Sequence, residues 1–135
     1  MSLEELLKDD VTLVLKRNGE IYTSAYNGIR PVLQFLSEGL LEDAEVADKV
    51  VGKASAMLMV KGKVSAVYAA LISEAGIKIL EHYGIPYRYG KKVPDIVNRD
   101  GTDMCPMEKT VKDIEDLEEA ETALRKKVAE LMGKQ

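Results

Sequence analysis

The chain is 135 residues long, 46% hydrophobic and 31% charged, with a formal net charge of −4 at pH 7. This size and composition indicate one globular domain that can bury a core without disulfides or structural metals. The Lys and Arg residues are spread along the chain, which argues against nucleic acid as a main partner. With one cysteine, Cys105, and one histidine, His82, an intramolecular disulfide and a structural zinc site of four Cys or His ligands are both excluded.

The sequence contains no sign of a membrane or export segment. No apolar stretch is long enough to cross a membrane. The first residues, Met-Ser-Leu-Glu-Glu, lack the charged-then-apolar pattern of a signal peptide. We therefore expect a reduced cytoplasmic protein, with residues 1–135 in a single domain.

The beginning of the chain predicts a short lead-in, a β-hairpin and a helix. Residues 1–10 form the lead-in. Two β-rich runs, residues 11–17 and 20–24, are separated by Asn18-Gly19. This dipeptide is the preferred two-residue hairpin turn, because both central residues need a positive φ. A helix is expected over residues 31–37, with a proline in its first turn.

A buried helix is predicted over residues 48–61. Asp48 is the expected N-cap, and Gly62 is the expected end of the helix. The residues between them are mostly apolar, and the polar ones form only a thin stripe along the helix. A helix that is apolar on most sides is expected to lie between other elements of the core.

The next segment predicts a parallel βαβ unit. Residues 64–72 form an almost unbroken apolar run, which is typical of a strand covered on both faces. A helix capped by Ser73 follows over residues 73–83, and a strand follows over 85–89. Residues 93–98 are expected to add an edge strand.

One long helix is predicted over residues 107–132, after a loop over 98–106. Its apolar residues fall near the a/d spacing of a coiled coil. The stripe fits a helix packed on its own domain, or a helix pair between two subunits.

Two predicted helix starts are the best candidates for a binding site. In α/β sheets, ligands collect at the carboxyl ends of the strands, where helix N-termini favour anions. We expect Asp48, Lys53, Ser73 and Glu74 to lie around such a site. Lys53 would bind a phosphate or carboxylate, and Glu74 would bind a hydroxyl or relay a proton. The alternatives are a buried Lys53–Glu74 ion pair, or a Lys53 side chain that reaches solvent.

Cys105 is a second candidate for chemistry. It lies where the loop meets the last predicted helix, and a thiol at a helix N-terminus can have a lowered pKa. A nucleophile also needs a base, and nothing in the sequence brings His82 to it. A structural, half-buried cysteine is the alternative.

Four segments together resemble a known family. They are residues 47–54, 73–76, 98–99 and 105–108, with the last reading Cys-Pro-Met-Glu. They resemble an uncharacterised bacterial and archaeal family, a domain of unknown function assigned to the cytidine-deaminase-like fold. The resemblance implies a three-layer α/β fold, with a mixed sheet that starts with a hairpin.

The resemblance also implies a pocket without zinc. Cytidine deaminases hold zinc with His and Cys residues at two helix starts, but residues 48–53 and 73–76 contain neither. No zinc and no zinc-dependent deamination are therefore expected. The leading hypothesis is a zinc-less deaminase-like domain that binds a nucleotide-like or other phosphate-bearing ligand, with Glu74 and Cys105 as the only catalytic candidates. The alternative is a homodimerising module that uses the 107–132 helix.

Overall fold

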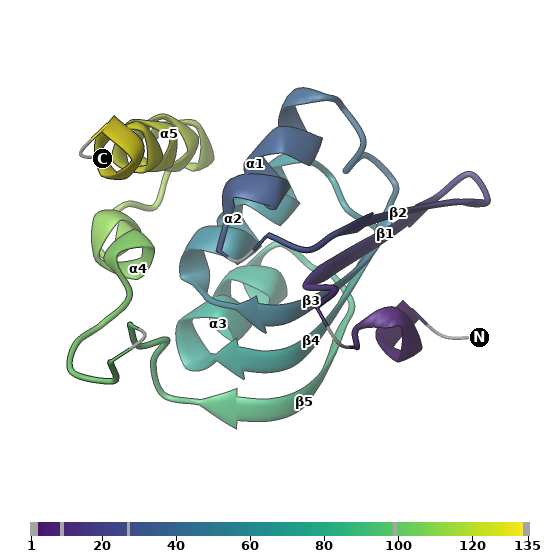
Figure 1. Ribbon diagram of the computed structural model, residues 1–135, viewed down its shortest axis with the longest axis horizontal. Helices are drawn as coiled ribbons and strands as arrows, with labels where there is room; N and C mark the ends of the chain where they lie inside the picture. The colour runs from purple at the N-terminus through teal and green to yellow at the C-terminus, as the bar shows by residue number, and fades with distance from the viewer. Residues whose placement is uncertain (1–2, 9, 27, 99, 134–135) are drawn as a thin grey trace.

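A five-stranded mixed sheet forms the centre of the protein (Figure 1). The computed structural model describes residues 3–8, 10–26, 28–98 and 100–133. The strands are β1 (Leu13–Arg17), β2 (Glu20–Ser24), β3 (Glu45–Val51), β4 (Ala66–Ser73) and β5 (Tyr87–Val93). The helices are the 3-10 helix η1 (Leu3–Leu6) and α1 (Arg30–Ser37), α2 (Lys53–Lys61), α3 (Glu74–His82), α4 (Pro106–Val111) and α5 (Leu117–Gly133). The sheet order is β2-β1-β3-β4-β5, with β1 antiparallel to both neighbours and β3, β4 and β5 parallel.

The predicted hairpin is confirmed. Strands β1 and β2 pair in antiparallel register, with Arg17 opposite Glu20. The two turn residues, Asn18 and Gly19, have φ angles of 51° and 80°. Both lie in the left-handed region that this turn requires.

Strand β3 corrects the prediction for residues 48–61. The segment Glu45–Val51 pairs with β1 on one side and β4 on the other, so the helix begins only at Lys53. Asp48, the predicted N-cap, lies inside the strand. In the sequence, β3 and α2 are both rich in apolar residues, and hydrophobic periodicity does not separate a short buried strand from a buried helix. The end of α2 is as predicted, with Gly62 as its C-cap.

The parallel β4–α3–β5 unit is confirmed, but its far edge differs from the prediction. Strand β5 is itself the edge of the sheet and ends at Val93, directly before Pro94. The additional edge strand predicted over residues 93–98 is wrong. Pro94 has no N–H to donate to a ladder, which fits the end of β5 at Val93. Among the described residues beyond β5, Val97 forms an isolated bridge to Met104.

Two helices, α4 and α5, replace the single helix predicted over residues 107–132. The Asp116 carboxylate accepts a hydrogen bond of 2.8 Å from the backbone N–H of Glu119, which starts α5 anew. Leu117, Leu124 and Val128, three residues of the predicted stripe, pack against the core of their own chain. The stripe is therefore used largely within the domain.

The two faces of the sheet are covered differently. On one face, Leu13, Leu15 and Val67 join a core with the helices, and α2 lies in its middle, packed against α1, α3, α4 and α5. Helices α4 and α5 lie beyond α2, far from η1 (Figure 1). On the other face, η1 packs on β1, β3 and β4, where Val14 and Ala47 are buried. We call this second face the open face.

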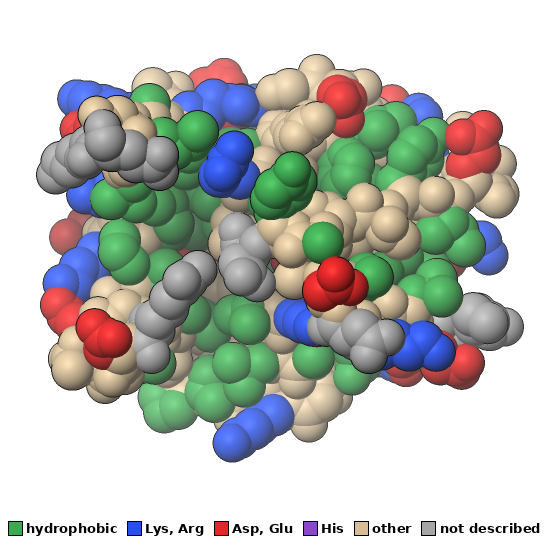
Figure 2. All heavy atoms as spheres, viewed as in Figure 1, with side chains coloured by type: hydrophobic (Ala, Val, Ile, Leu, Met, Phe, Trp, Pro, Cys, Tyr) green, Lys and Arg blue, Asp and Glu red, His purple; other side chains and the backbone are tan. Residues whose placement is uncertain are grey.

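The surface carries charges of both signs. Figure 2 shows Lys and Arg side chains interspersed with Asp and Glu side chains on the face in view. Across the part of the chain that the structure describes, no helix is both long and apolar enough to span a membrane.

Candidate functional site

Two helices start next to each other at the carboxyl edge of the parallel strands. Helix α2 follows β3 through Gly52, and α3 follows β4 directly at Ser73. A Cβ atom on Gly76 would lie 3.1 Å from the carbonyl oxygen of Val51. The first turn of α3 thus packs directly on the connection between β3 and α2, and a side chain at position 76 would push this backbone away by a few tenths of an ångström. The predicted juxtaposition of two helix starts is present.

The start of α2 is capped by a carboxylate from a distant part of the chain. The two Glu108 oxygens, on α4, accept hydrogen bonds of 2.8 Å from the backbone N–H groups of Lys53 and Ala54. Glu108 is only 8% exposed, and a Cβ atom on Gly52 would overlap its carboxylate. A carboxylate at a helix N-terminus satisfies unpaired amides and complements the helix dipole. The anion position predicted at this helix start is therefore occupied by the protein's own Glu108.

Lys53 points from the same helix start toward α4 and α5. Its side chain is 12% exposed, and its Nζ lies 3.7 Å from a carboxylate oxygen of Glu115, which is 83% exposed. The ammonium donates one hydrogen bond, of 3.1 Å, to the carbonyl oxygen of Lys112. The ion pair of Lys53 with Glu74, an alternative that the sequence left open, is not the one that forms.

The start of α3 is capped locally. Ser73 is buried, and its hydroxyl oxygen accepts a hydrogen bond of 3.0 Å from the backbone N–H of Gly76. This confirms Ser73 as the N-cap. Glu74, the next residue, is exposed to solvent.

A pocket of about 210 Å³ lies in front of these helix starts. We call it the carboxyl-edge pocket, and its lining residues are Lys53, Ser73, Ala75, Asp95, Ile96, Met104, Glu108 and Lys112. Two of the four predicted site residues, Lys53 and Ser73, line the pocket, whereas Asp48 and Glu74 do not. Sequence reasoning missed Asp95, Glu108 and Lys112. Glu108 belongs to the Cys-Pro-Met-Glu segment that carried the family resemblance, which was the available signal.

Asp48 is a buried carboxylate in the middle of the sheet. It lies in register between Leu13 on β1 and Ala69 on β4 and is 8% exposed. The backbone N–H of Val50 donates a hydrogen bond of 3.3 Å to it. Burial raises the pKa of the Asp48 carboxyl from 3.8 to about 7, and hydrogen bonds from the backbone of Val50 and Lys49 oppose this only in part. Asp48 is therefore a core residue whose ionised form is destabilised by burial. It is not a helix cap.

Cys105 and His82 lie in separate elements. Cys105 is half-buried at the N-cap of α4, and its backbone N–H donates to the carbonyl oxygen of Ile96. His82 is exposed near the end of α3, where its ring contacts Tyr83 edge-on. Neither residue lines the carboxyl-edge pocket. Within the described ranges, no three His, Cys, Asp or Glu side chains come together as metal ligands would.

The model of the family TM1506, a domain of unknown function (DUF1893), matches residues 2–128. The chain belongs to the DUF1893 family. A crystal structure of a DUF1893 family protein (TM1506) from Thermotoga maritima, at 2.70 Å resolution, is 32% identical in sequence and has a TM-score of 0.82. The similarity covers 93% of this chain and 86% of that one.

No curated protein matches this DUF1893 chain in sequence. The resemblance seen in the sequence is thus confirmed at the level of a family of unknown function with a mixed α/β fold. One residue of the segments that suggested it, Arg99, lies outside the described residues.

Proposed function

We propose that this DUF1893 protein binds a small phosphate-bearing, nucleotide-like molecule in the carboxyl-edge pocket, on a zinc-less cytidine-deaminase-like fold. The observation that carries the proposal is the charged Lys53 side chain, which is only 12% exposed at the wall of this pocket. The parallel β3–α2–β4–α3–β5 arrangement, with both helix starts at one edge, supports the fold part of the proposal. Ligands of open α/β sheets bind at this edge.

The described contacts compensate the Lys53 charge only in part. An ammonium has three N–H donors, and one of them donates to the Lys112 carbonyl oxygen. The carboxylate of Glu115 lies 3.7 Å away, which is beyond a hydrogen bond, and it is strongly hydrated. A buried charge is costly unless it is paired and hydrogen-bonded. A ligand anion in the pocket would supply the missing partner.

The pocket also restricts how such a ligand is held. Because Glu108 takes the two α2 amides, the anion would bind between Lys53 and the start of α3. The pocket, at about 210 Å³, is smaller than the roughly 300–1,000 Å³ of typical ligand sites. It therefore suits one part of a nucleotide, such as its phosphate and sugar, with the remainder in solvent. Asp95 and Lys112 at the rim offer an acceptor and a donor to the sugar.

Titration of a matched pair of variants tests this proposal. Binding of inorganic phosphate, ribose 5-phosphate and a nucleoside monophosphate would be measured by calorimetry on wild type, Lys53→Met and Lys78→Met. Lys78 is an exposed lysine of the neighbouring helix α3 and serves as the control. Loss of a charge-assisted hydrogen bond should weaken binding by about tenfold or more in Lys53→Met alone. Equal affinities of the two variants, or no binding to wild type, would refute the proposal.

A second candidate function is homodimerisation through the end of α5. Leu131 and Met132 are 42% and 45% exposed there, although the rest of the stripe is packed within the domain. Light scattering on wild type and on Leu131→Lys/Met132→Lys tests this candidate. A dimer that the double variant converts to monomer would support it, and a monomeric wild type would exclude it.

A further inference from the structure

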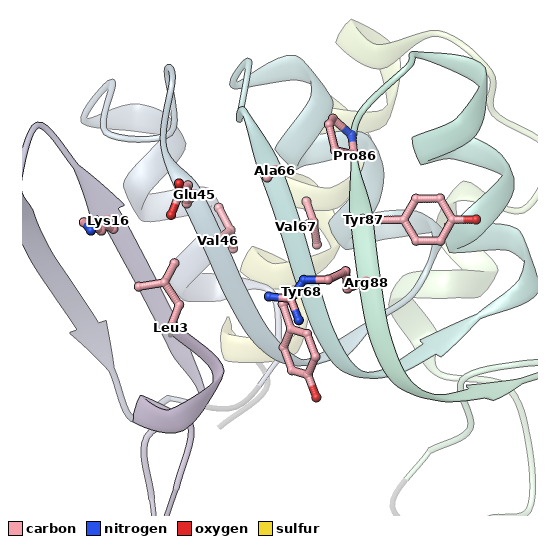
Figure 3. A pocket seen from close by; sticks show the side chains of 10 residues that line it. All are labelled: Leu3, Lys16, Glu45, Val46, Ala66, Val67, Tyr68, Pro86, Tyr87 and Arg88. Carbon is pink, nitrogen blue, oxygen red and sulfur yellow. The ribbon is translucent and has the colours of Figure 1, made fainter. Parts of the chain in front are cut away.

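A second cavity lies on the opposite side of the sheet from the carboxyl-edge pocket. It measures about 380 Å³, which is within the usual range for sites of small molecules, roughly 300–1,000 Å³. It lies on the open face, at the amino ends of β3, β4 and β5 and beside η1 (Figure 3). We call it the open-face cavity. Its position is independent of Lys53 and of the two helix starts.

Most of the cavity wall is apolar. Seven of its lining residues are apolar or aromatic, namely Leu3, Val46, Ala66, Val67, Tyr68, Pro86 and Tyr87. The side chains of Val46 and Val67 are buried in the core on the helix-covered face, so the apolar side chains on the open face come mainly from Leu3, Ala66, Tyr68 and Pro86. Leu3 approaches from η1 on one side, and Tyr68 and Arg88 approach from the sheet on the other (Figure 3). Ala66 is the register partner of Glu45 in the parallel ladder, and its small side chain leaves room at the wall.

The charges at the cavity are balanced in pairs. Lys16 and Glu45 are direct register partners on β1 and β3, where opposite charges attract. Arg88 donates two hydrogen bonds, of 2.8 and 2.7 Å, to the two carboxylate oxygens of Glu4 on η1. The Arg88 guanidinium also lies 5.2 Å from the centre of the Tyr68 ring, a cation–π distance. A charged ligand would therefore be repelled by one member of each pair wherever the other member attracts it.

The Glu4–Arg88 pair also fixes the position of η1. The two hydrogen bonds tie this short helix to the edge strand β5, 84 residues away in sequence. Leu3, next to Glu4, is thereby held against the cavity. A bidentate pair of this kind restricts orientation more than a single hydrogen bond does. The wall formed by η1 is thus preorganised.

We propose that the open-face cavity binds an uncharged, largely apolar ring compound. Apolar walls favour burial of apolar surface, and an aromatic wall favours a ring. The balanced charges disfavour both anions and cations. A rigid ring also loses little conformational freedom on binding. This site differs in place and in ligand chemistry from the phosphate site proposed above.

A set of three related probes tests the charge selectivity. The backbone amide signals of ¹⁵N-labelled protein would be followed by NMR during titration with indole, indole-3-acetate and tryptamine. Indole should bind with a Kd of about 1 mM, as expected for a fragment of this size. Its signals should move around Ala66, Tyr68 and Arg88, and the anionic and cationic analogues should bind more weakly. No saturable shift with indole, or tighter binding of either ion, would overturn the proposal.

Two variants locate the site. Ala66→Leu fills the cavity and should abolish the indole shifts, whereas Ala129→Leu, on the exposed side of α5, should leave them unchanged. Leu3→Ala removes an apolar side chain of η1 from the cavity wall and should weaken indole binding about fivefold. This variant leaves the sheet unchanged, so it tests the site even if Ala66→Leu does not fold. Indole binding that is unaffected by Leu3→Ala would place the probe elsewhere and refute the site.

Discussion

Two buried carboxylates, Glu108 and Asp48, show how position decides what burial costs. Each is 8% exposed. Glu108 accepts two hydrogen bonds of 2.8 Å from the first turn of α2, where the helix dipole favours a negative charge. Asp48 lies mid-strand with a hydrogen bond of 3.3 Å from Val50, and burial raises its pKa to about 7. The sequence assigned the α2 cap to Asp48, but in the structure Glu108 takes that role.

The comparison predicts its largest effect for Asp48→Asn at alkaline pH. Because the folded pKa, about 7, exceeds the ordinary value of 3.8, neutral Asp48 stabilises the fold below pH 4. This stabilisation is lost as the pH rises to 7. At 1.4 kcal/mol per pKa unit, the charged form costs up to roughly 4 kcal/mol above pH 7. Asn carries no charge, so Asp48→Asn should be more stable than wild type by up to this amount at pH 8.

Urea unfolding of wild type and Asp48→Asn between pH 4 and pH 8 measures this effect. The difference in unfolding free energy should be near zero at pH 4 and should grow toward pH 8. A difference that is constant across this range would show that ionisation of Asp48 does not destabilise the fold.

Glu108→Gln should lower the unfolding free energy, by somewhat less than Asp48→Asn raises it. The amide keeps the shape of the side chain but loses the charge and one acceptor, which leaves a buried backbone N–H unsatisfied. A loss of about 2–3 kcal/mol in unfolding free energy is expected. Glu115→Gln, on an exposed glutamate, is the control and should change stability by less than about 0.5 kcal/mol. Equal effects of the two substitutions would show that the Glu108 carboxylate does not stabilise the fold by capping α2.

Gly52→Ala tests the same cap from the other side of the contact. The added methyl group overlaps the Glu108 carboxylate and should cost about 2 kcal/mol. Gly133→Ala has no atom in its way and is the matched control. In a double-mutant cycle with Glu108→Gln, the two costs should be clearly less than additive. Strict additivity would show that the two residues do not act on one contact.

Ser73→Ala is expected to give the smallest effect. Loss of the local cap on α3 should cost about 1 kcal/mol, and Ser73→Asn should restore most of it because asparagine also caps helices. Thermal unfolding of the three proteins measures this ranking. A larger loss of stability in Ser73→Ala than in Glu108→Gln would contradict the prediction that the Glu108 cap contributes more than the Ser73 cap.

The contrast between Ser73 and Glu108 also shows what could be predicted from sequence. The hairpin turn at Asn18-Gly19 and the Ser73 cap depend on neighbouring residues, so local patterns predicted both. The Glu108 cap joins positions 55 residues apart, and no local pattern encodes that distance. Strand β3 was missed because its hydrophobicity continues into α2. The break between α4 and α5 was missed because the heptad spacing runs across it, although Asp116 carried a capping signal.

The candidate site was predictable to a similar extent. The rule that ligands bind at the carboxyl edge of a sheet led to Lys53 and Ser73, which line the carboxyl-edge pocket. It also selected Asp48 and Glu74, because the helix boundary was misplaced and the direction of an exposed side chain is not encoded locally. Asp95 and Lys112 come from loops whose path only the folded chain defines.

Amide NMR during titration with ribose 5-phosphate tests the central claim most directly, because one spectrum reports on both cavities. The proposed function predicts saturable shifts at Lys53, Ser73 and Lys112, with the signals of Ala66 and Tyr68 unchanged, and loss of these shifts in Lys53→Met. An absence of shifts at the carboxyl-edge pocket, or shifts confined to the open-face cavity, would contradict it.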